Sequence, residues 1–392
     1  MTAYAEQYRT VRRTTELLAA PLTAEDQTVQ SMPDVSPTKW HRAHTTWFFE
    51  RFVVQCCAGL YEPFHPRYEY LFNSYYETVG PRHARPARGL VTRPGVAEIA
   101  GYREHVDAEV LDLLMCGLPP EALALVELGL HHEQQHQELI LMDIKHVLSC
   151  NPLLPAYGDL PWHEERTRPR QGWTGHAGGV VEVGHAGDVF AFDNEGPRHE
   201  TLLRPFELAG SLVRNHEWLD FMADGGYERP ELWMSDGWYA VQANGWRSPE
   251  YWYDLDGAWH VYTLDGLVPV DPDAAVVHVS WYEADAFARW ASARLPLEAE
   301  WEAVAPDPGA AQAGDWYGEA WQWTESPYRP YPGFRPPAGA VGEYNGKFMV
   351  NQHVLRGSCV ATPPGHARRT YRNFFPPHAR WAFAGVRLAR DA

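Results

Sequence analysis

The sequence predicts two domains, an N-terminal four-helix bundle and a C-terminal domain of irregular α+β structure. In the first third of the 392-residue chain, apolar residues recur at three- and four-residue steps between helix-capping residues. Residues 151–178 are rich in proline, glycine and charge, which is typical of a connecting segment. Beyond them, short apolar stretches alternate with Gly, Pro and Trp, which indicates few long regular elements. We therefore predict a multidomain α and α+β protein with domains at 1–150 and 179–392.

Four segments with helical periodicity lie at residues 4–19, 36–59, 94–117 and 119–149. The second begins at Ser36-Pro37, where a hydroxyl N-cap precedes a proline in the first turn. The connection at 61–90 is too rich in proline for a helix and too aromatic for a flexible linker, so we expect an ordered, functional loop. Bundles of this kind hold metals and ligands between facing helices. Thirteen tryptophans (Trp218 through Trp381) fall in the second domain, where we expect them to anchor a core.

The composition is that of an ordinary globular protein, with 45% hydrophobic and 21% charged residues. The 33 Lys and Arg against 51 Asp and Glu give a net charge of −18, which repels nucleic acid and anionic membrane surfaces. We find neither a signal peptide nor an apolar run long enough to span a membrane. The five cysteines have no regular spacing, as expected of reduced thiols. We expect a cytoplasmic protein without nucleic-acid or membrane partners, and the sequence does not predict its oligomeric state.

The strongest local signal is His132-Glu133-Gln134-Gln135-His136 in the fourth predicted helix. Residues four apart lie on one helical face, so the two imidazoles can bind one metal ion. Zinc proteases share this pattern and use the glutamate as a general base, but their third ligand lies downstream, where nothing in this chain fits. The alternative is a pair of solvated histidines on the outer face of the helix.

A third ligand is available upstream, in Trp40-His41-Arg42-Ala43-His44 of the second predicted helix. Helical periodicity does not choose between His41 and His44, and either can be an ordinary packed histidine instead. Three neutral imidazoles with open positions suit zinc, ferrous iron, copper or nickel, so the ligands alone do not settle the metal.

The predicted loop adds two phenols and a group of arginines. Tyr75-Tyr76 is followed by Arg82, Arg85 and Arg88. Phenols can transfer protons, and guanidinium groups bind carboxylates through two parallel hydrogen bonds. The alternative is ordinary packing for the tyrosines and solvated charge for the arginines.

Taken together, these residues resemble the ergothioneine-biosynthesis sulfoxide synthases (EgtB-type), which are non-haem iron enzymes. That family joins a DinB-like four-helix bundle to an irregular formylglycine-generating-enzyme-like (C-type-lectin-like) domain. The resemblance covers nearly the whole chain and is carried by SPTKWHRAHTTWFFE, YLFNSYYETVGPRHARPARG, HHEQQHQEL, HVSWYEADAFARWA, LPLEAEWE and YRNFFPPHARWAFAGVRLARD.

The resemblance implies that His44, His132 and His136 bind Fe(2+), with Glu133 in a supporting role. Members use O2 to join the sulfur of a thiol to the imidazole ring of hercynine, which is trimethylated histidine, and leave a sulfoxide. Holding both substrates at one ion supplies orientation that free reactants lack. Tyr75 or Tyr76 is implied as the proton donor that favours coupling over oxidation of the thiol.

The resemblance also implies substrate-binding residues. Arg85 and Arg88 are implied at the carboxylate of the sulfur donor, because a guanidinium offers bidentate recognition. Gln135 is implied at an iron-bound substrate. Asn373, Phe374 and Phe375 match a covering segment whose aromatic faces can hold the trimethylammonium group.

Two departures from the family pattern refine the prediction. Members that use γ-glutamylcysteine carry Asn-Trp-Asp where this chain has Asn373-Phe374-Phe375, and an arginine four residues after that Asp, whereas Arg380 lies one place further along. Free cysteine is therefore implied as the sulfur donor. Formylglycine-generating enzymes bind copper through two late cysteines, but here Ala361 and His366 occupy those positions after Cys359. We expect the second domain to bind substrate and cover the site, and Cys359 to be a buried small residue.

Three alternatives remain open at the level of the sequence. One is a zinc-dependent DinB-like thiol transferase or hydrolase that uses the same histidines. Another is a selenium-transferring relative that acts on hercynine. The last is a non-catalytic binding module in which the Trp-rich domain holds a sugar or a peptide.

Overall fold

The structure, a computed structural model, describes residues 3–162, 172–311 and 313–392. The described chain forms two compact units. The first comprises the residues up to 162 together with Leu264–Gly266 and Pro337–Tyr344, and the second comprises the rest. Part of the predicted connecting segment 151–178 lies outside the described residues, so the predicted domain boundaries stay a prediction.

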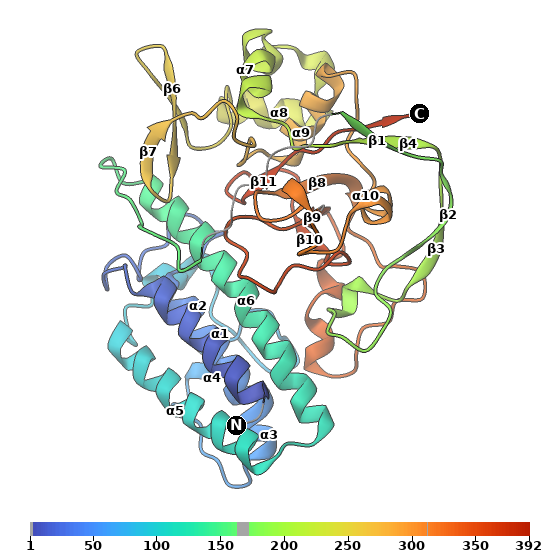
Figure 1. The fold of residues 1–392 in the computed structure, drawn as a ribbon. Coiled ribbons are helices and arrows are strands. Elements are labelled where there is room, and N and C mark those ends of the chain that lie inside the picture. Colours follow the sequence, from blue (N-terminus) through green and yellow to red (C-terminus); the bar gives the residue numbers. More distant parts are fainter. Residues whose placement is uncertain (1–2, 163–171, 312) are drawn as a thin grey trace. The chain divides into compact units, whose positions relative to one another are not determined.

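The first unit is a bundle of four long helices (Figure 1): α1 (Ala3–Ala19), α2 (Thr38–Phe49), α5 (Val96–Cys116) and α6 (Pro120–Ser149). Helix α6 contacts α1 and α2, and α2 also contacts α5. The predicted helical bundle is thereby confirmed. Among the described residues, no helix combines the length and the apolar composition that a membrane span needs.

The second helix differs from its prediction at both ends. It begins at Thr38 after Pro37, and Ser36 is not its N-cap. The Ser36 hydroxyl oxygen accepts a hydrogen bond from Arg88 Nη1 at 2.9 Å, and the Ser36 N–H donates to Asp143 Oδ2 at 2.7 Å. After Phe49 the helix continues through a π-helical turn, η1 (Glu50–Val54), into the short α3 (Gln55–Cys57). A tertiary hydrogen bond from Arg88 therefore takes the place of the expected local cap.

The connection between α2 and α5 contains helical turns that its proline content did not predict. These are α4 (Tyr68–Phe72) and the 3-10 helix η2 (Arg85–Leu90). Tyr68 and Phe72 are both buried, and they lie one turn apart, so packing of one face stabilises α4 despite its short length. The expectation that proline excludes helix from this loop was wrong in these two places.

Gly129 allows α6 to approach the end of α2 closely. A Cβ at this position would lie 2.5 Å from the ring of Phe49 and 3.1 Å from that of Phe48. A glycine in the middle of a helix costs about 1 kcal/mol relative to alanine, so the close approach explains its presence one turn before His132 and Glu133.

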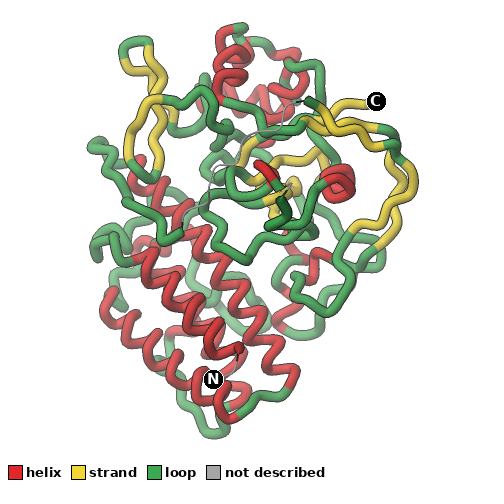
Figure 2. The backbone as a smooth tube through the Cα atoms, in the orientation of Figure 1, coloured by secondary structure: helices red, strands yellow, loops and turns green. Residues whose placement is uncertain are grey.

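The second unit consists of short strands, short helices and long loops (Figure 2). The strands that follow the bundle are β1 (Trp173–His176), β2 (Gly179–Val183), β3 (His199–Leu203), β4 (Phe206–Ala209), β5 (Trp252–Leu255), β6 (Ala258–Thr263), β7 (Gly266–Pro269), β8 (Trp321–Pro327), β9 (His353–Gly357), β10 (Asn373–Phe375), β11 (Ala384–Gly385) and β12 (Ala389–Asp391). The helices are α7 (Asn215–Ala223), α8 (Ser235–Asn244), α9 (Trp281–Trp290) and α10 (Glu298–Val304).

These strands form four small sheets, in the orders β1-β4-β12, β10-β9-β8-β11, β2-β3 and β5-β6-β7. In the second of them, β9 is antiparallel to β8 and β10, whereas β11 is parallel to β8. Helix α9 begins at a capping box, in which Ser280 Oγ accepts the Glu283 N–H and Glu283 Oε2 accepts the Ser280 N–H. The predicted irregular α+β structure is confirmed.

Tryptophans anchor the core of the second unit, as the sequence predicted. Trp218, Trp301, Trp321 and Trp323 are each at most 1% exposed. Trp301 belongs to a cluster with Leu203, Phe206, Leu208, Trp316 and Ala389, which joins α10 to strands β3, β4 and β12. Indole rings thus supply the apolar area that the short elements lack.

Candidate active site

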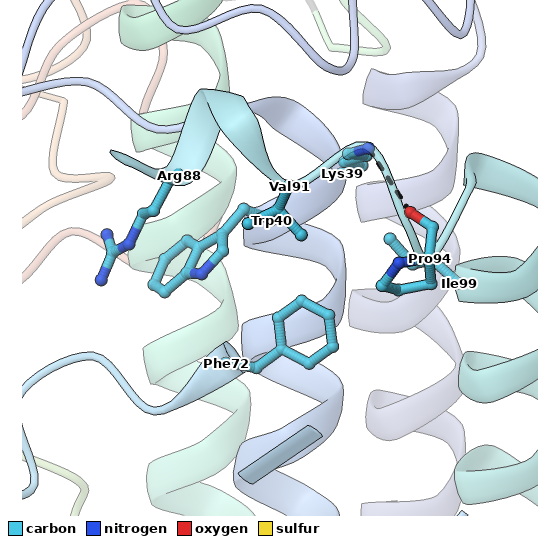
Figure 3. A pocket seen from close by; sticks show the side chains of 7 residues that line it. All are labelled: Lys39, Trp40, Phe72, Arg88, Val91, Pro94 and Ile99. Atoms are coloured by element: carbon cyan, nitrogen blue, oxygen red, sulfur yellow. Dashed lines mark hydrogen bonds between the residues drawn. The ribbon is translucent and has the colours of Figure 1, made fainter. Parts of the chain in front are cut away.

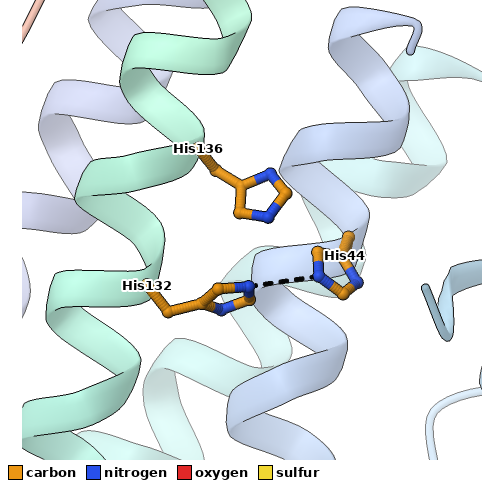
Figure 4. Close-up of side chains that lie close together, drawn as sticks. All are labelled: His44, His132 and His136. Carbon is orange, nitrogen blue, oxygen red and sulfur yellow. Dashed lines mark hydrogen bonds between the residues drawn. The ribbon is translucent and has the colours of Figure 1, made fainter. Parts of the chain in front are cut away.

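Three histidines from two helices of the bundle form one buried cluster. His44 lies on α2, and His132 and His136 lie one turn apart on α6. Their side chains point toward one another (Figure 4), with one ligand nitrogen from each lying within 4.8 Å of the others. The closest approach, 3.2 Å, joins Nε2 of His44 to Nε2 of His132. We call these residues the histidine cluster.

Burial makes the histidine cluster a set of neutral nitrogen donors. It lowers the pKa of His132 to about 3, and it lowers the pKa values of His44 and His136 well below their ordinary range, with the neighbouring imidazoles adding to the effect. Neutral imidazole is the form that binds divalent metal ions. Three such nitrogens at this spacing, with no carboxylate among them, fit an ion such as Fe²⁺ or Zn²⁺.

Helix α4 orients the first of these histidines. Nδ1 of His44 lies 2.6 Å from the carbonyl oxygen of Phe72, the last residue of α4, so this nitrogen donates its proton to the carbonyl. The ring is also stacked on Trp40, with the ring centres 4.7 Å apart. The proton on Nδ1 leaves Nε2 of His44 free to bind a metal.

His41, the other candidate from the sequence, lies behind the histidine cluster. Its Nδ1 is 2.8 Å from Nδ1 of His136, and its Nε2 is 2.9 Å from Oδ2 of Asp143 on α6. The geometry therefore places His44 in the cluster and gives His41 two other partners. Asp143 had not been singled out in the sequence, although it lies two helical turns after His136.

Glu133 points away from the histidine cluster and into the bundle. Its carboxylate accepts hydrogen bonds from Arg12 Nη1 (2.8 Å), Arg103 Nη2 (2.9 Å) and Thr15 Oγ1 (2.6 Å). Burial alone would raise the pKa of Glu133, but the charges of Arg12 and Arg103 outweigh it and lower the pKa to about 2. A carboxylate with so little basicity and all three partners in place cannot serve as the general base of a hydrolase.

The two predicted phenols lie on the same unit as the cluster. The rings of Tyr75 and Tyr76 are stacked with centres 4.6 Å apart, and their hydroxyl oxygens lie 3.5 Å apart. Tyr76 is fully buried against Trp47 and Phe52. Burial raises the pKa of Tyr76 well above its ordinary value, and the adjacent Tyr75 raises it further, so the phenol keeps its proton.

Tyr344 brings a segment from far along the chain to this site. Its hydroxyl donates to the side-chain oxygen of Gln135, and its ring lies edge-on to His132 at 5.6 Å and to Tyr75 at 6.2 Å. Gln135, between the two α6 histidines in sequence, was predicted as a substrate-binding residue. Tyr344 was not predicted, because nothing local in the sequence links residues so far apart.

Glu343 binds the same segment to the loop that carries Tyr75 and Tyr76. Its carboxylate accepts the backbone N–H groups of Glu77 and Thr78 at 3.0 and 2.9 Å and the Thr78 hydroxyl at 2.6 Å. The turn that follows Tyr75 and Tyr76 is therefore fixed by charge-assisted hydrogen bonds.

The two predicted arginines of the loop have different surroundings. Arg85 is exposed and donates to the backbone oxygen of Asp34. Arg88 is buried over the ring of Trp40 and donates to Ser36 Oγ (2.9 Å) and Ser74 Oγ (3.2 Å). Within the described part of the chain, no carboxylate lies within ion-pair distance of Arg88, and its Nε lacks a hydrogen-bond partner.

Arg88 also borders a small pocket (Figure 3), which is lined by Lys39, Trp40, Phe72, Arg88, Val91, Pro94 and Ile99. The guanidinium group of Arg88 points away from Lys39 and Pro94, which are joined by a 3.4 Å hydrogen bond. Burial lowers the pKa of Arg88, and the positive charge of Arg85 adds to this effect. The charge of Asp143 opposes these effects, but Arg88 makes no direct ion pair within the described residues. A buried guanidinium group of this kind favours an anionic ligand.

The remaining predicted substrate residues belong to the second unit. Asn373, Phe374 and Phe375 make up β10, which pairs with β9. Phe374 stacks on Tyr328 with ring centres 4.1 Å apart. The structure therefore places all three predicted residues on one short strand.

Arg380 and Cys359 have structural surroundings in the second unit. Arg380 pairs with Glu283 at 3.0 Å and with Glu250 at 2.8 Å, so its charge is already compensated. Cys359 is fully buried, and its backbone N–H donates to Thr362 Oγ1. All five cysteines are free thiols.

Sequence comparisons relate both units to known proteins. Residues 163–317 and 308–392 match the family model of the sulfatase-modifying factor enzyme 1-like domain. The chain is 32% identical to the hercynine oxygenase of Mycobacterium tuberculosis, over 92% of this chain and 92% of that protein. It is 31% identical to the hercynine oxygenase of Mycolicibacterium smegmatis, over 79% of this chain and 81% of that protein. The formylglycine-generating enzyme of Streptomyces coelicolor is 32% identical over 38% of this chain and 52% of that protein.

Proposed function

The chain belongs to the hercynine oxygenase family, and from that premise we propose that it is a non-haem, iron(II)- and O2-dependent sulfoxide synthase of ergothioneine biosynthesis. Family membership makes the protein an enzyme of the oxidoreductase class. The proposed substrates are hercynine, cysteine and O2, the proposed product is hercynyl-cysteine sulfoxide, and the proposed location is the cytoplasm. The observation that carries the proposal is the histidine cluster with two phenols on the same unit.

The proposed reaction balances with O2 as the oxidant. A C–H bond of the hercynine imidazole and the S–H bond of cysteine break, and a C–S bond and an S–O bond form. One oxygen atom of O2 is retained in the sulfoxide, and the other leaves as water with the two hydrogens. Ferrous iron bound by His44, His132 and His136 would supply the electron transfer to O2 and the open positions where the substrates meet.

The protein's own residues position the substrates and hold protons. Arg88, a buried guanidinium group without a carboxylate partner, is the stronger candidate for the carboxylate of cysteine, and Arg85 is the other. Gln135 is proposed to contact an iron-bound substrate. The pair of Tyr75 and Tyr76 is proposed to deliver a proton during coupling, because both phenols lie next to each other and the buried one stays protonated.

The sulfur donor follows from the charges that the chain offers. γ-Glutamylcysteine carries a second carboxylate, and the family members that use this thiol carry an Asp and an Arg in the corresponding segment. Here Arg380, which lies one place beyond the family's arginine position, already has two glutamates as partners, which supports cysteine as the donor. In the second unit, Asn373, Phe374 and Phe375 remain predictions for binding the trimethylammonium group of hercynine.

The proposed function is tested by anaerobic reconstitution with ferrous iron, followed by aerated hercynine and cysteine, with γ-glutamylcysteine in a parallel reaction. Mass spectrometry should find hercynyl-cysteine sulfoxide only when iron, O2 and cysteine are all present. Product with γ-glutamylcysteine alone would reassign the donor. Tight zinc binding without product from either thiol would contradict the proposal and favour a zinc-dependent thiol transferase, and transfer of selenium to hercynine would favour the selenium-using relative.

A further inference from the structure

His41 and Asp143 form a buried pair that none of the proposed steps uses. His41 is 2% exposed and lies one turn before His44 on α2, and Asp143 is 3% exposed and lies two turns after His136 on α6. The pair is closed by the 2.9 Å contact between His41 Nε2 and Asp143 Oδ2. It reaches the histidine cluster through the 2.8 Å contact between the Nδ1 atoms of His41 and His136.

The chemistry of the partners assigns the direction of both hydrogen bonds. A carboxylate only accepts, so Nε2 of His41 donates to Asp143. A neutral imidazole has one donor and one acceptor, so Nδ1 of His41 accepts, and the proton between the two rings belongs to Nδ1 of His136. His136 is then left with a free lone pair on Nε2, which is the nitrogen available to a metal ion.

The position of Asp143 is itself fixed by the polypeptide backbone. The N–H of Ser36, just before α2, donates to the same carboxylate oxygen at 2.7 Å. That oxygen thus accepts from two donors on neighbouring segments, and it connects the start of α2 to the end of α6. The hydroxyl of Ser36 accepts from Arg88, so the same turn also orients this arginine.

The three histidines of the cluster differ in the hydrogen-bond partner of their Nδ1 atom. Nδ1 of His44 donates to a neutral backbone carbonyl, and Nδ1 of His132 has no hydrogen-bond partner in the described part of the chain. His136 is the one of the three whose Nδ1 is hydrogen-bonded, through His41, to a carboxylate. A carboxylate behind a ligating histidine fixes the tautomer and raises the basicity of the ligand.

We propose that His41 and Asp143 are positioning residues that preset His136 for metal binding and strengthen it relative to the other two ligands. This inference rests on the proposed metal site and adds a specific support to it. It also explains why the second helix carries two inward histidines, only one of which lies in the cluster.

The test compares metal binding by variants of the pair with a control on the same helix. Asp143→Asn keeps the shape and removes the charge, His41→Gln removes the imidazole link, and His146→Gln removes a different hydrogen-bonded histidine of α6, which contacts Ser31. The readouts are the dissociation constant for Fe²⁺ under anaerobic conditions, the ligand-field absorption of bound Co²⁺, and the melting temperature of the metal-free protein.

We expect both variants of the pair to bind Fe²⁺ about 10- to 100-fold more weakly than the unchanged protein, and the Co²⁺ bands to shift. The double variant should bind no more weakly than His41→Gln alone, because both residues act through one path. The His146→Gln control should stay within about twofold, as expected of a site outside the path.

Unchanged metal affinity and Co²⁺ spectra in Asp143→Asn would overturn the proposal, even if the metal-free variant melts at a lower temperature. That variant decides the matter if His41→Gln does not fold, since its side chain has nearly the same shape. Failure of the unchanged protein to bind Fe²⁺ or Co²⁺ would overturn the proposed metal site as well, so the two failures are distinguishable.

Discussion

The two sides of helix α6 use neighbouring residues of one motif for different purposes. His132 and His136 face His44 and His41 on α2, and the histidine cluster contains no carboxylate. Glu133 faces α1 and α5, where Arg12, Arg103 and Thr15 satisfy its carboxylate completely. On the first side, which we call the open side, the histidine nitrogens are available to the proposed metal ion. On the second, the closed side, the carboxylate already has its partners.

Hydrogen bonds on the closed side join α6 to α1 and thereby fix the helix that carries His132 and His136. One turn after Glu133, the amide of Gln137 donates to the Val11 carbonyl at 2.8 Å and to Thr15 Oγ1 at 3.0 Å. These bonds join α6 to α1 along the side opposite the cluster. A metal site needs such support from the surrounding scaffold, because its ligands must be held in fixed positions. Stability and function should thus separate between adjacent residues, which the following variants can test.

The largest effect is expected from His132→Ala. Loss of one of three proposed ligands should reduce kcat/KM for sulfoxide formation by at least about 1000-fold, because a metal ion supplies several kcal/mol of transition-state stabilisation. The free energy of unfolding of the metal-free protein should change less than the activity, since Nδ1 of the buried His132 has no hydrogen-bond partner in the described part of the chain. Activity assays and urea titration measure the two quantities. A stable variant with ordinary activity would remove His132 from the site.

Glu133→Gln should show the opposite behaviour. Removing the charge leaves Arg12 and Arg103 without their shared partner inside the bundle, which we expect to cost about 3–5 kcal/mol of unfolding free energy. The kcat of the folded protein should stay within a few-fold of the original value. Glu121→Gln, at an exposed position in the first turn of α6, is the matched control and should have almost no effect on stability. A large loss of kcat without a loss of stability would reverse the comparison.

The stability difference between the unchanged protein and Glu133→Gln should depend on pH. The pKa of Glu133 is lowered in the folded state to about 2 from an ordinary value of 4.5, so the folded state holds this proton more weakly than the unfolded state. The contribution of Glu133 is fully present above pH 4.5 and is lost as the pH falls toward 2, by about 1.4 kcal/mol per pH unit in between. Urea titrations at several pH values measure it. A difference that grows as the pH falls would contradict the assigned charge.

The sequence predicted the four helices because their periodicity is local, and the pair of His132 and His136 because four-residue spacing on a helix is a local property. It could not orient Glu133, since the motif looks the same whether the glutamate faces a metal or a pair of arginines on α1 and α5. Helical periodicity also left His41 and His44 unresolved, and it was the resemblance to the family that implied His44. The distance of seven residues from His136 to Asp143 contained a usable signal, because both lie on one face of α6.

Other parts of the site depend on contacts that have no local signature. The segment with Glu343 and Tyr344 reaches the bundle from more than two hundred residues beyond Gln135, so no pattern in the sequence predicts its place. The N-cap assigned to Ser36 was wrong for a related reason. The hydroxyl oxygen of Ser36, which a local cap would use, accepts a hydrogen bond from Arg88 in the connecting loop instead.

The open side of the site is tested further by Arg88→Ala. A charge-assisted hydrogen bond contributes about 1.5–3 kcal/mol, so KM for cysteine should rise about 10- to 150-fold while KM for hercynine changes much less. Arg88→Lys should recover only part of the loss, because an ammonium group lacks the planar fork. Arg82→Ala, an exposed arginine paired with Glu77, is the control. Equal effects on both substrates would assign Arg88 to the structure of the site, and a larger effect of Arg85→Ala would exchange the two arginines.

The smallest expected effect on rate, but the most specific one, is a change in products when Tyr75 and Tyr76 are replaced by Phe one at a time. Tyr75 contacts Tyr344, which contacts His132, whereas Tyr76 packs against Trp47 and its hydroxyl lies beside that of Tyr75. We therefore expect Tyr75→Phe to raise oxidation of cysteine relative to sulfoxide formation by the larger factor.

Tyr76→Phe should shift the product ratio in the same direction but less, since it is the ring of Tyr75 that contacts Tyr344. The shift should be constant between about pH 6 and 9, because burial keeps the Tyr76 phenol protonated in this range. Mass spectrometry of both sulfur products measures the ratio independently of the total rate, so a partly unfolded variant does not obscure the result. Unchanged ratios in both variants would remove the phenols from proton delivery and leave them as packing residues, which would make the open side of α6 a metal site with a proton source still to be found elsewhere.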